Sequence, residues 1–185
     1  MVLAQRAVSL IEQLFSNSEP DDQSFNVIFL WLQTLNHGAT RNPLFLDIFV
    51  MKLLACLGFE PELETCVRCG NYPSLLRRGI EPAYRTVRGE VSFIFDIAAG
   101  GLVCAKCEQK LISSDHLSQL SSGLLKALRT IADRKGNFSL ILDKKEAGAL
   151  HKLVYRFGVF HSGKKLKEWH NQDELSTHPL IDRKK

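Results

Sequence analysis

Residues 42–70, NPLFLDIFVMKLLACLGFEPELETCVRCG, decide the fold, because a long apolar segment here runs directly into a pair of cysteines. Asn42 can cap the free amides of a helix, Pro43 suits its first turn, and Gly58 suits the left-handed residue after its end. The residues between them are apolar nearly all round, which is typical of a helix at the centre of a bundle. The stretch therefore predicts a buried helix followed by a cysteine knuckle.

Two amphipathic helices are expected before this segment. Residues 2–15 carry apolar side chains at helical spacing, and a second helix is expected to end before Gly38. The second helix is expected to bury one face, which consists of Phe25, Ile28, Phe29, Leu32 and Leu35. Both helices are expected to pack in the same bundle as the central one.

Two more helices are expected near the end of the chain. Ser121 or Ser122 can cap the first of them. Asp143 with Glu146 three residues later forms a capping-box-like start for the second, and Gly163 suits its end.

The region between the helices has a different character. Residues 63–112 lose the helical period, residues 91–95 predict a short strand, and Gly100 with Gly101 predicts a turn. The sequence thus predicts a mostly α protein, a helical bundle with an inserted four-cysteine zinc subdomain that contains short β-strands. The expected divisions are residues 1–62 and 113–170 for the two parts of the bundle, 63–112 for the insertion and 171–185 for a flexible tail.

The composition is that of an ordinary globular protein. Hydrophobic residues make up 45% and charged residues 24%, and the net charge of +4 permits an acidic or nucleic-acid partner without demanding one. The first residues lack the regions of a secretory signal, and the most apolar stretch, residues 44–59, is interrupted by Asp47 and Lys52. We therefore expect a cytoplasmic protein without a membrane segment.

Four of the five cysteines form two C-x-x-C pairs, which are Cys66 with Cys69 and Cys104 with Cys107. Two intervening residues let both sulfurs of a pair reach one ion at about 2.3 Å, and two pairs complete a tetrahedron. The pattern predicts one structural Zn²⁺ per chain, with Arg68 and Lys106 offsetting the charge of the thiolates. The 34 residues between the pairs exceed the usual zinc-ribbon spacing, so two unrelated reduced pairs remain the alternative. We interpret Cys56 as a core residue.

Enzyme motifs are missing from the sequence. No histidine is followed two positions later by glutamate, as a zinc deaminase requires, and there is no phosphate-binding glycine loop or nucleophile elbow. A thioredoxin-like redox pair would follow a strand, whereas the first cysteine pair follows a predicted helix. We therefore do not expect an enzyme.

Basic residues gather in two places. The first group lies between the cysteine pairs and consists of Arg77, Arg78, Arg85 and Arg88. These arginines could contact the phosphates of a nucleic acid. The second group lies on the last helix and just beyond it. For both groups the alternative is a solvated face without a partner.

Two motifs stand in the same order as in a known family. The first is Phe49-x-x-Lys52-Leu53-Leu54-x-x-Leu57-Gly58-Phe59-x-Pro61-x-Leu63-x-x-Cys66-x-x-Cys69-Gly70, and the second is Phe95-Asp96-x-x-x-Gly100-Gly101-Leu102-x-Cys104-x-x-Cys107. Together they resemble the helix-to-zinc passage and the second knuckle of RecO, a family of bacterial recombination and repair proteins. The resemblance runs from about Ala7 to Lys167 and is weakest between the cysteine pairs.

The resemblance implies a non-enzymatic mediator of DNA repair and recombination in the RecF pathway, located in the cytoplasm at the nucleoid. It implies two partners, a RecR-like protein and the tail of the single-stranded-DNA-binding protein. Family members carry an OB-fold domain before the first of these helices, and we expect this sequence to lack it. Because an OB fold supplies the groove and aromatic rings that hold single strands, we expect only a weak contact with single-stranded DNA.

The implied tail is acidic and ends in an apolar residue, which suits the basic last helix. The expected partner-binding residues are Lys152, Leu153, Arg156, Phe157, Lys164 and Lys165. Lys152 and Arg156 are four residues apart and project from one face, while Leu153 and Phe157 are expected to line an adjoining pocket. The alternative function is a stand-alone zinc-ribbon module that binds nucleic acid through the arginines between its knuckles.

Overall fold

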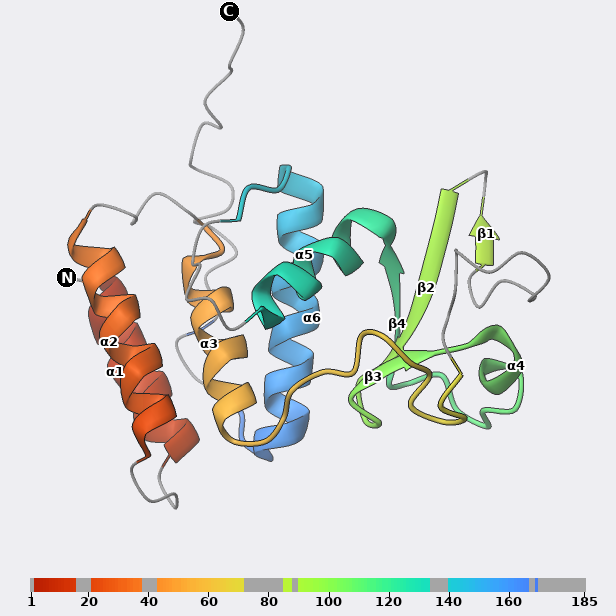
Figure 1. The fold of residues 1–185 in the computed structure, drawn as a ribbon, viewed down its shortest axis with the longest axis horizontal. Coiled ribbons are helices and arrows are strands. Elements are labelled where there is room, and N and C mark those ends of the chain that lie inside the picture. Colours follow the sequence, from red (N-terminus) through yellow and green to blue (C-terminus); the bar gives the residue numbers. More distant parts are fainter. Residues whose placement is uncertain are drawn as a thin grey trace, which may run out of the picture.

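The computed structural model describes residues 2–15, 21–37, 43–71, 85–87, 90–133, 140–166 and 169. In these ranges the helices are α1 (Val2–Phe15), α2 (Asp22–Asn36), α3 (Phe45–Cys56), α4 (Ala105–Glu108), α5 (Ser122–Ala132) and α6 (Lys144–Ser162). The strands are β1 (Arg85–Val87), β2 (Glu90–Asp96), β3 (Gly101–Val103) and β4 (Leu117–Ser121). Figure 1 shows the five longer helices on one side and the sheet with α4 on the other. The mostly α class with a small β-containing subdomain is confirmed.

Helix α3 lies at the centre of the bundle, as its apolar sequence predicts. Ten of its 12 residues are buried, and it contacts α1, α2, α5 and α6. The helix ends in a left-handed Gly58 with φ 86°, where the Phe59 N–H donates to the Leu54 carbonyl at 2.9 Å. Its start differs from the prediction, because Pro43 lies in a turn and the helix begins at Phe45. The proposed cap Asn42 lies outside the described residues.

The face that α2 buries differs in part from the expected one. Phe25 and Phe29 are 66% and 48% exposed, and Leu32 is also exposed, whereas Trp31 is buried. The Trp31 ring stacks on Phe45 and Phe49 of α3, with ring centroids 5.0 Å and 4.6 Å apart. Its indole N–H also donates to the Phe45 carbonyl at 3.4 Å. Burying this larger ring rotates α2, so that Phe25, Phe29, Leu30 and Leu32 face outward, while Ile28 and Leu35 of the expected face pack against the core.

The remaining helix signals are confirmed. Ser121 caps α5, with its hydroxyl oxygen accepting from the Leu124 N–H at 3.0 Å. Asp143 caps α6 by accepting from the Glu146 N–H at 2.8 Å. Helix α6 ends at a left-handed Gly163 with φ 64°. These caps satisfy amides and carbonyls that a helix end leaves unpaired.

Strand β2 organises the sheet. It pairs antiparallel with β1 through residues 90–92, with β3 through residues 94–96 and with β4 through residues 92–96. Because Ser92 and Ile94 each already pair with β4 on one side, β1 and β3 follow one another along the opposite edge.

The sheet and the bundle share one apolar core. Phe93 and Phe95 of β2 are buried, and the Phe95 ring meets the edge of Phe157 on α6 with centroids 5.9 Å apart. Strand β4 runs directly into α5, which joins the sheet to the bundle covalently. No helix within the described residues is long and apolar enough to cross a membrane.

Candidate metal centre

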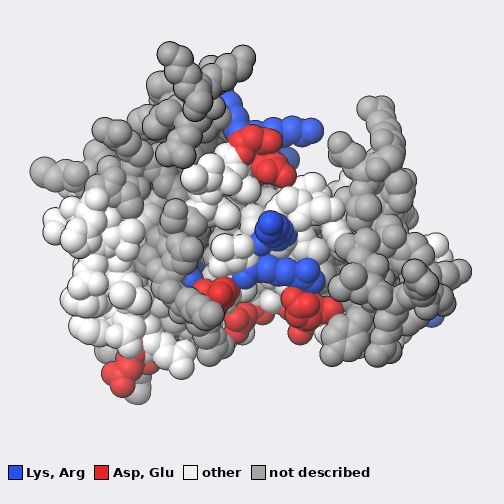
Figure 2. Space-filling model, turned by 45° about the horizontal axis from the view of Figure 1, so that its top comes forward, with Lys and Arg blue, Asp and Glu red and all other residues white. Residues whose placement is uncertain are grey.

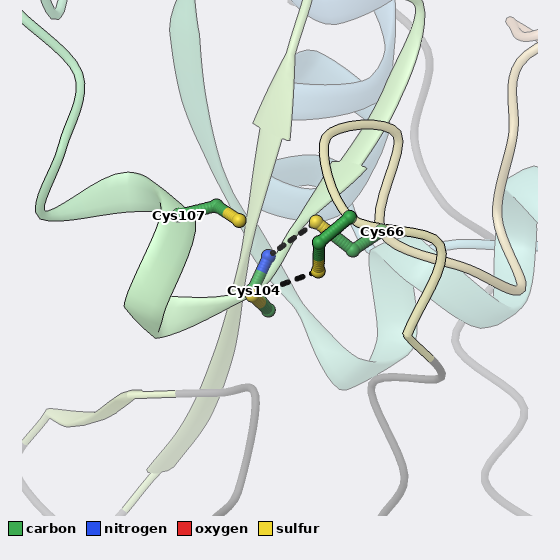
Figure 3. Close-up of side chains that lie close together, drawn as sticks. Cys66, Cys104 and Cys107 are labelled. Carbon is green, nitrogen blue, oxygen red and sulfur yellow. Dashed lines mark hydrogen bonds between the residues drawn. The ribbon is translucent and has the colours of Figure 1, made fainter.

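The four paired cysteines converge on one point. The sulfur atoms of Cys66, Cys69, Cys104 and Cys107 all lie within 4.8 Å of one another. Figure 3 shows the side chains of Cys66, Cys104 and Cys107 turned toward a common centre, Cys107 from α4 and Cys66 from the loop that follows α3. Within the described ranges this is the one cluster of His, Cys, Asp or Glu side chains suited to hold a metal ion.

The spacing between the sulfurs fits a tetrahedral ion. Four sulfurs at about 2.3 Å from one centre would lie about 3.8 Å from each other. The sulfurs of Cys69 and Cys104 are 3.8 Å apart, although they come from different pairs. The donor set is therefore complete with four sulfurs, and a tetrahedral ion would have no open position for a substrate.

Local backbone turns aim each pair. In the first knuckle the Gly70 N–H donates to the Cys66 carbonyl at 2.8 Å, and the Cys66 N–H donates to the Asn71 carbonyl at 2.8 Å. In the second knuckle Cys104 stands at the start of α4, and the N–H of Cys107 donates to its carbonyl at 3.0 Å. Two intervening residues thus suffice to turn both sulfurs of each pair the same way.

The thiols of the cluster differ in acidity. Burial alone would raise the pKa of Cys66, but backbone N–H groups, first that of Cys104 at 3.3 Å, donate to its sulfur and lower the pKa to about 7. Burial and the three neighbouring sulfurs raise the pKa of Cys107 to about 12, and burial also raises the pKa of Cys104. Once one thiol ionises, its charge disfavours ionisation of the others. A divalent cation at the centre would remove this penalty.

Arg68 ties the first knuckle to the sheet. Its guanidinium donates to the carboxylate of Asp96, at the end of β2, at 2.7 Å. Burial alone would raise the pKa of Asp96, but the hydrogen bond and charge of Arg68 together with the backbone N–H groups of Ala98 and Ala99 outweigh it and hold the pKa below its usual range. The charge of Arg68 thus stabilises a buried carboxylate as well as facing the sulfur cluster.

A close backbone contact holds the two knuckles together. The loop before Cys66 runs beside β3, where Glu62 forms a bridge with Gly101. The Leu102 N–H donates to the Glu62 carbonyl at 2.9 Å, and the Val67 N–H donates to the Leu102 carbonyl at 2.9 Å. Gly101 has no side chain to fill this contact, and a Cβ there would lie 2.5 Å from the Glu62 carbonyl oxygen.

The arginines expected to contact nucleic acid are only partly described. Arg77, Arg78 and Arg88 lie outside the described residues, and Arg85 lies in β1 with only its backbone described. Figure 2 shows Lys and Arg side chains beside Asp and Glu side chains near the middle of one face. The described residues on that face therefore form no continuous basic surface of the kind that tracks a phosphate backbone.

The residues expected to bind a partner on α6 fall into two groups. Leu153 and Phe157 are 5% and 1% exposed and belong to the core, so they line no surface pocket. The Phe157 ring contacts Phe95 of the sheet and so points inward. Arg156 is also engaged, because its guanidinium donates to the Ser118 hydroxyl at 2.9 Å.

The lysines of that set lie nearer the surface. Lys152 and Lys165 are exposed, and Lys164 donates through Nζ to the Gln13 carbonyl of α1 at 2.7 Å. Lys164 therefore also joins the end of α6 to the first helix.

The comparison with known families matches nearly the whole chain. The model of the family described as recombination protein O, C terminal, matches residues 1–170. The chain belongs to this family. The matched range of this C-terminal RecO family includes both cysteine pairs.

Three curated RecO relatives show how far the similarity extends. "DNA repair protein RecO" of Lactobacillus helveticus is 28% identical over 139 residues, which are 75% of this chain and 48% of the relative. The protein of the same name from Streptomyces griseus is 30% identical over 62% of this chain and 40% of its own. The one from Listeria monocytogenes is 25% identical over 85% of this chain and 54% of its own. The chain thus spans about half the length of these RecO proteins. No solved structure matches it.

Two polar residues interrupt the apolar sequence of α3. Both are buried and paired. Asp47 accepts from Trp169 and His151, and Lys52 donates through Nζ to the carbonyls of Ile131 and Asp133, both at 3.0 Å. Burial lowers the pKa of Lys52, while the charge of Asp133 opposes this. A charged residue inside an otherwise apolar helix was the available signal, because buried charges need partners.

Proposed function

We propose that this chain is a non-enzymatic module of DNA repair and recombination that acts through contacts with other proteins. The match of residues 1–170 to the C-terminal RecO family carries this proposal, because the relatives are named DNA repair proteins. A closed four-sulfur centre supports a structural role for the metal, since no ligand position remains for a reacting group. The proposed location is the cytoplasm, at the nucleoid.

The proposed metal is Zn²⁺, one per chain, since zinc readily accepts four thiolates in a tetrahedral site. Elemental analysis of protein purified without added metal should find about one equivalent. Cys66→Ser or Cys104→Ser should abolish binding and destabilise the fold around the knuckles, while Cys56→Ala should keep the metal. Full zinc and unchanged unfolding in Cys66→Ser would show that the site is not built from these four sulfurs.

The proposed partners are a RecR-like protein and the acidic tail of the single-stranded-DNA-binding protein. Lys152 and Lys165 are the proposed contacts for the carboxylates of the tail, because both are exposed. Exposed ion pairs are weak, so binding should be micromolar and should fade as the salt concentration rises. Arg77, Arg78, Arg85 and Arg88 are proposed to add a weak contact with single-stranded DNA.

The apolar end of the tail needs a pocket, and one lies between α2, α3 and α5. This pocket has a volume of about 320 Å³. Its walls are largely apolar and include Val27, Leu30, Met51, Ala55 and Ile131. Lys52 and Glu60 also line it, so the pocket combines apolar surface with one cation and one carboxylate. We propose this pocket, in place of Leu153 and Phe157, as the anchor site for an apolar end residue.

A fluorescent tail peptide titrated against matched variants tests these contacts. Lys152→Glu with Lys165→Glu should weaken binding several-fold at low salt, and Ala55→Trp should weaken it by filling the pocket. Arg156 is left unchanged, because its loss would disturb the sheet. Equal binding by the wild type and the variants would show that these residues do not belong to the site. No binding by the zinc-loaded wild type to the tail or to a RecR-like protein would contradict the function itself.

The division of the chain into residues 1–62, 63–112, 113–170 and 171–185 also remains a proposal. Limited proteolysis followed by mass spectrometry would test it. Cleavage first after residue 170 and then within 72–84 would support the proposed tail and the proposed insertion. Cleavage within α6 before either of these sites would contradict the division.

A further inference from the structure

The segment after α6 turns back onto the helix. Gly163 takes a left-handed conformation at the end of α6, and the chain then places Leu166 and Trp169 against the bundle. Leu166 is 0% exposed and Trp169 is 3% exposed. We call these two residues the C-terminal latch.

The indole of Trp169 occupies a site made by α3 and α6. We call this the indole site, and its residues are Asp47, His151, Tyr155 and Gly158. The indole N–H donates to Asp47 Oδ1 at 2.9 Å. The rings of His151 and Tyr155 meet the indole edge-on, with centroids 6.0 Å and 5.5 Å away.

Gly158 leaves the space that the latch needs. A Cβ at this position would lie 3.0 Å from Trp169 and 3.2 Å from Leu166, which is tighter than ordinary contact. Gly158 lies within a helix, where glycine is unfavourable compared with alanine. The close approach of both latch residues accounts for a glycine there.

One carboxylate oxygen serves two donors in this site. His151 Nδ1 also lies 2.9 Å from Asp47 Oδ1, and the Asp47 side chain is only 3% exposed. His151 Nε2 is buried without a hydrogen-bond partner among the described residues. A proton on Nε2 would bury a charged N–H without a partner, so protonation of His151 is disfavoured while the indole covers the site.

We propose that Leu166 and Trp169 form a latch that closes by placing the indole on Asp47, and that protonation of His151 opens it. Among the described residues, Asp47 of α3 is the charged group that contacts His151, and Tyr155 is the other titratable group beside the indole. The latch follows directly after Lys165, so its opening loosens the chain beside this proposed contact. Only this last consequence for partner binding rests on the proposed function.

The direction of the pH dependence follows from burial. The hydrogen bond and the charge of Asp47 raise the pKa of His151, although burial opposes this. Asp47 belongs to α3 and pairs with His151 whether the latch is closed or open, whereas the indole adds burial only when the latch is closed, so protonation of His151 favours the open latch. The latch is therefore tightest at alkaline pH and loosens as the pH falls.

Acrylamide quenching of tryptophan fluorescence measures the opening directly. The chain has two tryptophans, and Trp31 is buried in the bundle, so Trp169→Phe supplies the Trp31 signal to subtract. Quenching of Trp169 should rise at least about twofold from pH 9 to pH 6. His151→Gln, which cannot titrate, should show no such rise. Equal quenching at both pH values in the wild type, or the same rise in His151→Gln, would overturn the proposal.

A second experiment tests the site without titration. Trp169→Ala should leave a cavity that binds free indole, seen as a rise in melting temperature on adding indole. Benzothiophene has the same shape and is more apolar but lacks the N–H. Indole should bind more tightly only if Asp47 accepts its hydrogen bond. Tighter binding of benzothiophene, or no binding of either ring, would overturn the indole site.

If Trp169→Ala does not fold, Trp169→Phe replaces it, with trypsin cleavage after Lys165 as the readout. Cleavage should be faster than in the wild type at the same pH, because the phenyl ring fills the site but cannot bond to Asp47. An unchanged rate would contradict the role of the hydrogen bond. Both latch experiments read the chain alone, so their outcome is independent of whether a partner binds.

Discussion

Replacing Gly101 by alanine should loosen the contact that joins the two cysteine knuckles. The new Cβ would lie 2.5 Å from the Glu62 carbonyl oxygen, whereas ordinary contact begins at 3.4 Å, so the loop and β3 must separate by about 0.9 Å. The obstructing atom belongs to the backbone, and rotation of a side chain cannot relieve the clash. The Val67 side chain, whose Cγ1 would lie 2.5 Å from the new Cβ, obstructs it as well.

The expected cost follows from the hydrogen bonds at this contact. Three backbone bonds of 2.9 Å cross it, two at Glu62 and one at Val67. Lengthening each by about 0.9 Å would take it beyond the usual range of hydrogen-bond distances. At about 0.5–1.5 kcal/mol for each bond, Gly101→Ala should cost about 2–4 kcal/mol. In a chain of this length that lowers the melting temperature by about 4–16 °C.

Two other glycines supply matched controls. Gly100 has φ 77°, and a new Cβ there would be in ordinary contact with the His161 ring at 3.9 Å, so Gly100→Ala should cost only about 1–2 kcal/mol for the left-handed backbone. Gly148 lies inside α6 with no described atom within 4 Å of a new Cβ, so Gly148→Ala should stabilise the chain by about 1 kcal/mol. Three Gly→Ala changes thus have three different expected results.

Thermal unfolding and metal retention during dialysis against a chelator measure the series. Gly101→Ala should also lose metal faster than the other two variants, because the contact positions the loop that carries Cys66 against the strand that leads to Cys104. A melting temperature for Gly101→Ala equal to that of Gly100→Ala would refute the reasoning. Unchanged metal retention would show that the contact does not support the cluster.

Other predictions concern the buried charges and the fifth cysteine. Lys52→Met should lower stability by about 2 kcal/mol in urea unfolding, because it removes two bonds to the carbonyls at the end of α5, while Lys126→Met on the exposed face should change little. Arg68→Met should destabilise the chain at neutral pH, and the difference from wild type should shrink in acid, since protonated Asp96 no longer needs the cation. A difference that persists in acid would contradict this pairing. Cys56, which lines the pocket, should react with a thiol reagent in zinc-loaded protein, and bound tail peptide should slow the reaction.

The sequence by itself determined the elements whose signals act over a few residues. Ser121 and Asp143 cap their helices, and Gly58 and Gly163 end theirs, because a cap or a left-handed residue satisfies the backbone groups next to it. The apolar run that forms α3 predicts a helix that other helices surround, whatever their order along the chain. The two cysteine pairs indicated a metal site for the same reason, since the spacing within each pair already fits one ion.

The tertiary structure decided what depends on partners far along the chain. Two cysteine pairs with 34 residues between them meet only because β3 and the loop after α3 run side by side. Helix α2 carries two apolar faces, and the one that packs against α3 is the one that holds Trp31. Leu153 and Phe157 are likewise buried, because the packing of α6 decides which of its faces the rest of the fold covers.

Asp47 shows most clearly why sequence patterns stop at this point. Its partners His151 and Trp169 lie 104 and 122 residues away, and nothing local links them. A carboxylate in an apolar helix indicates that a partner exists, because burying an unpaired charge costs too much free energy. Which side chain provides that partner depends on how α3, α6 and the last segment pack. The packing free energy that selects the partner arises only when the core forms.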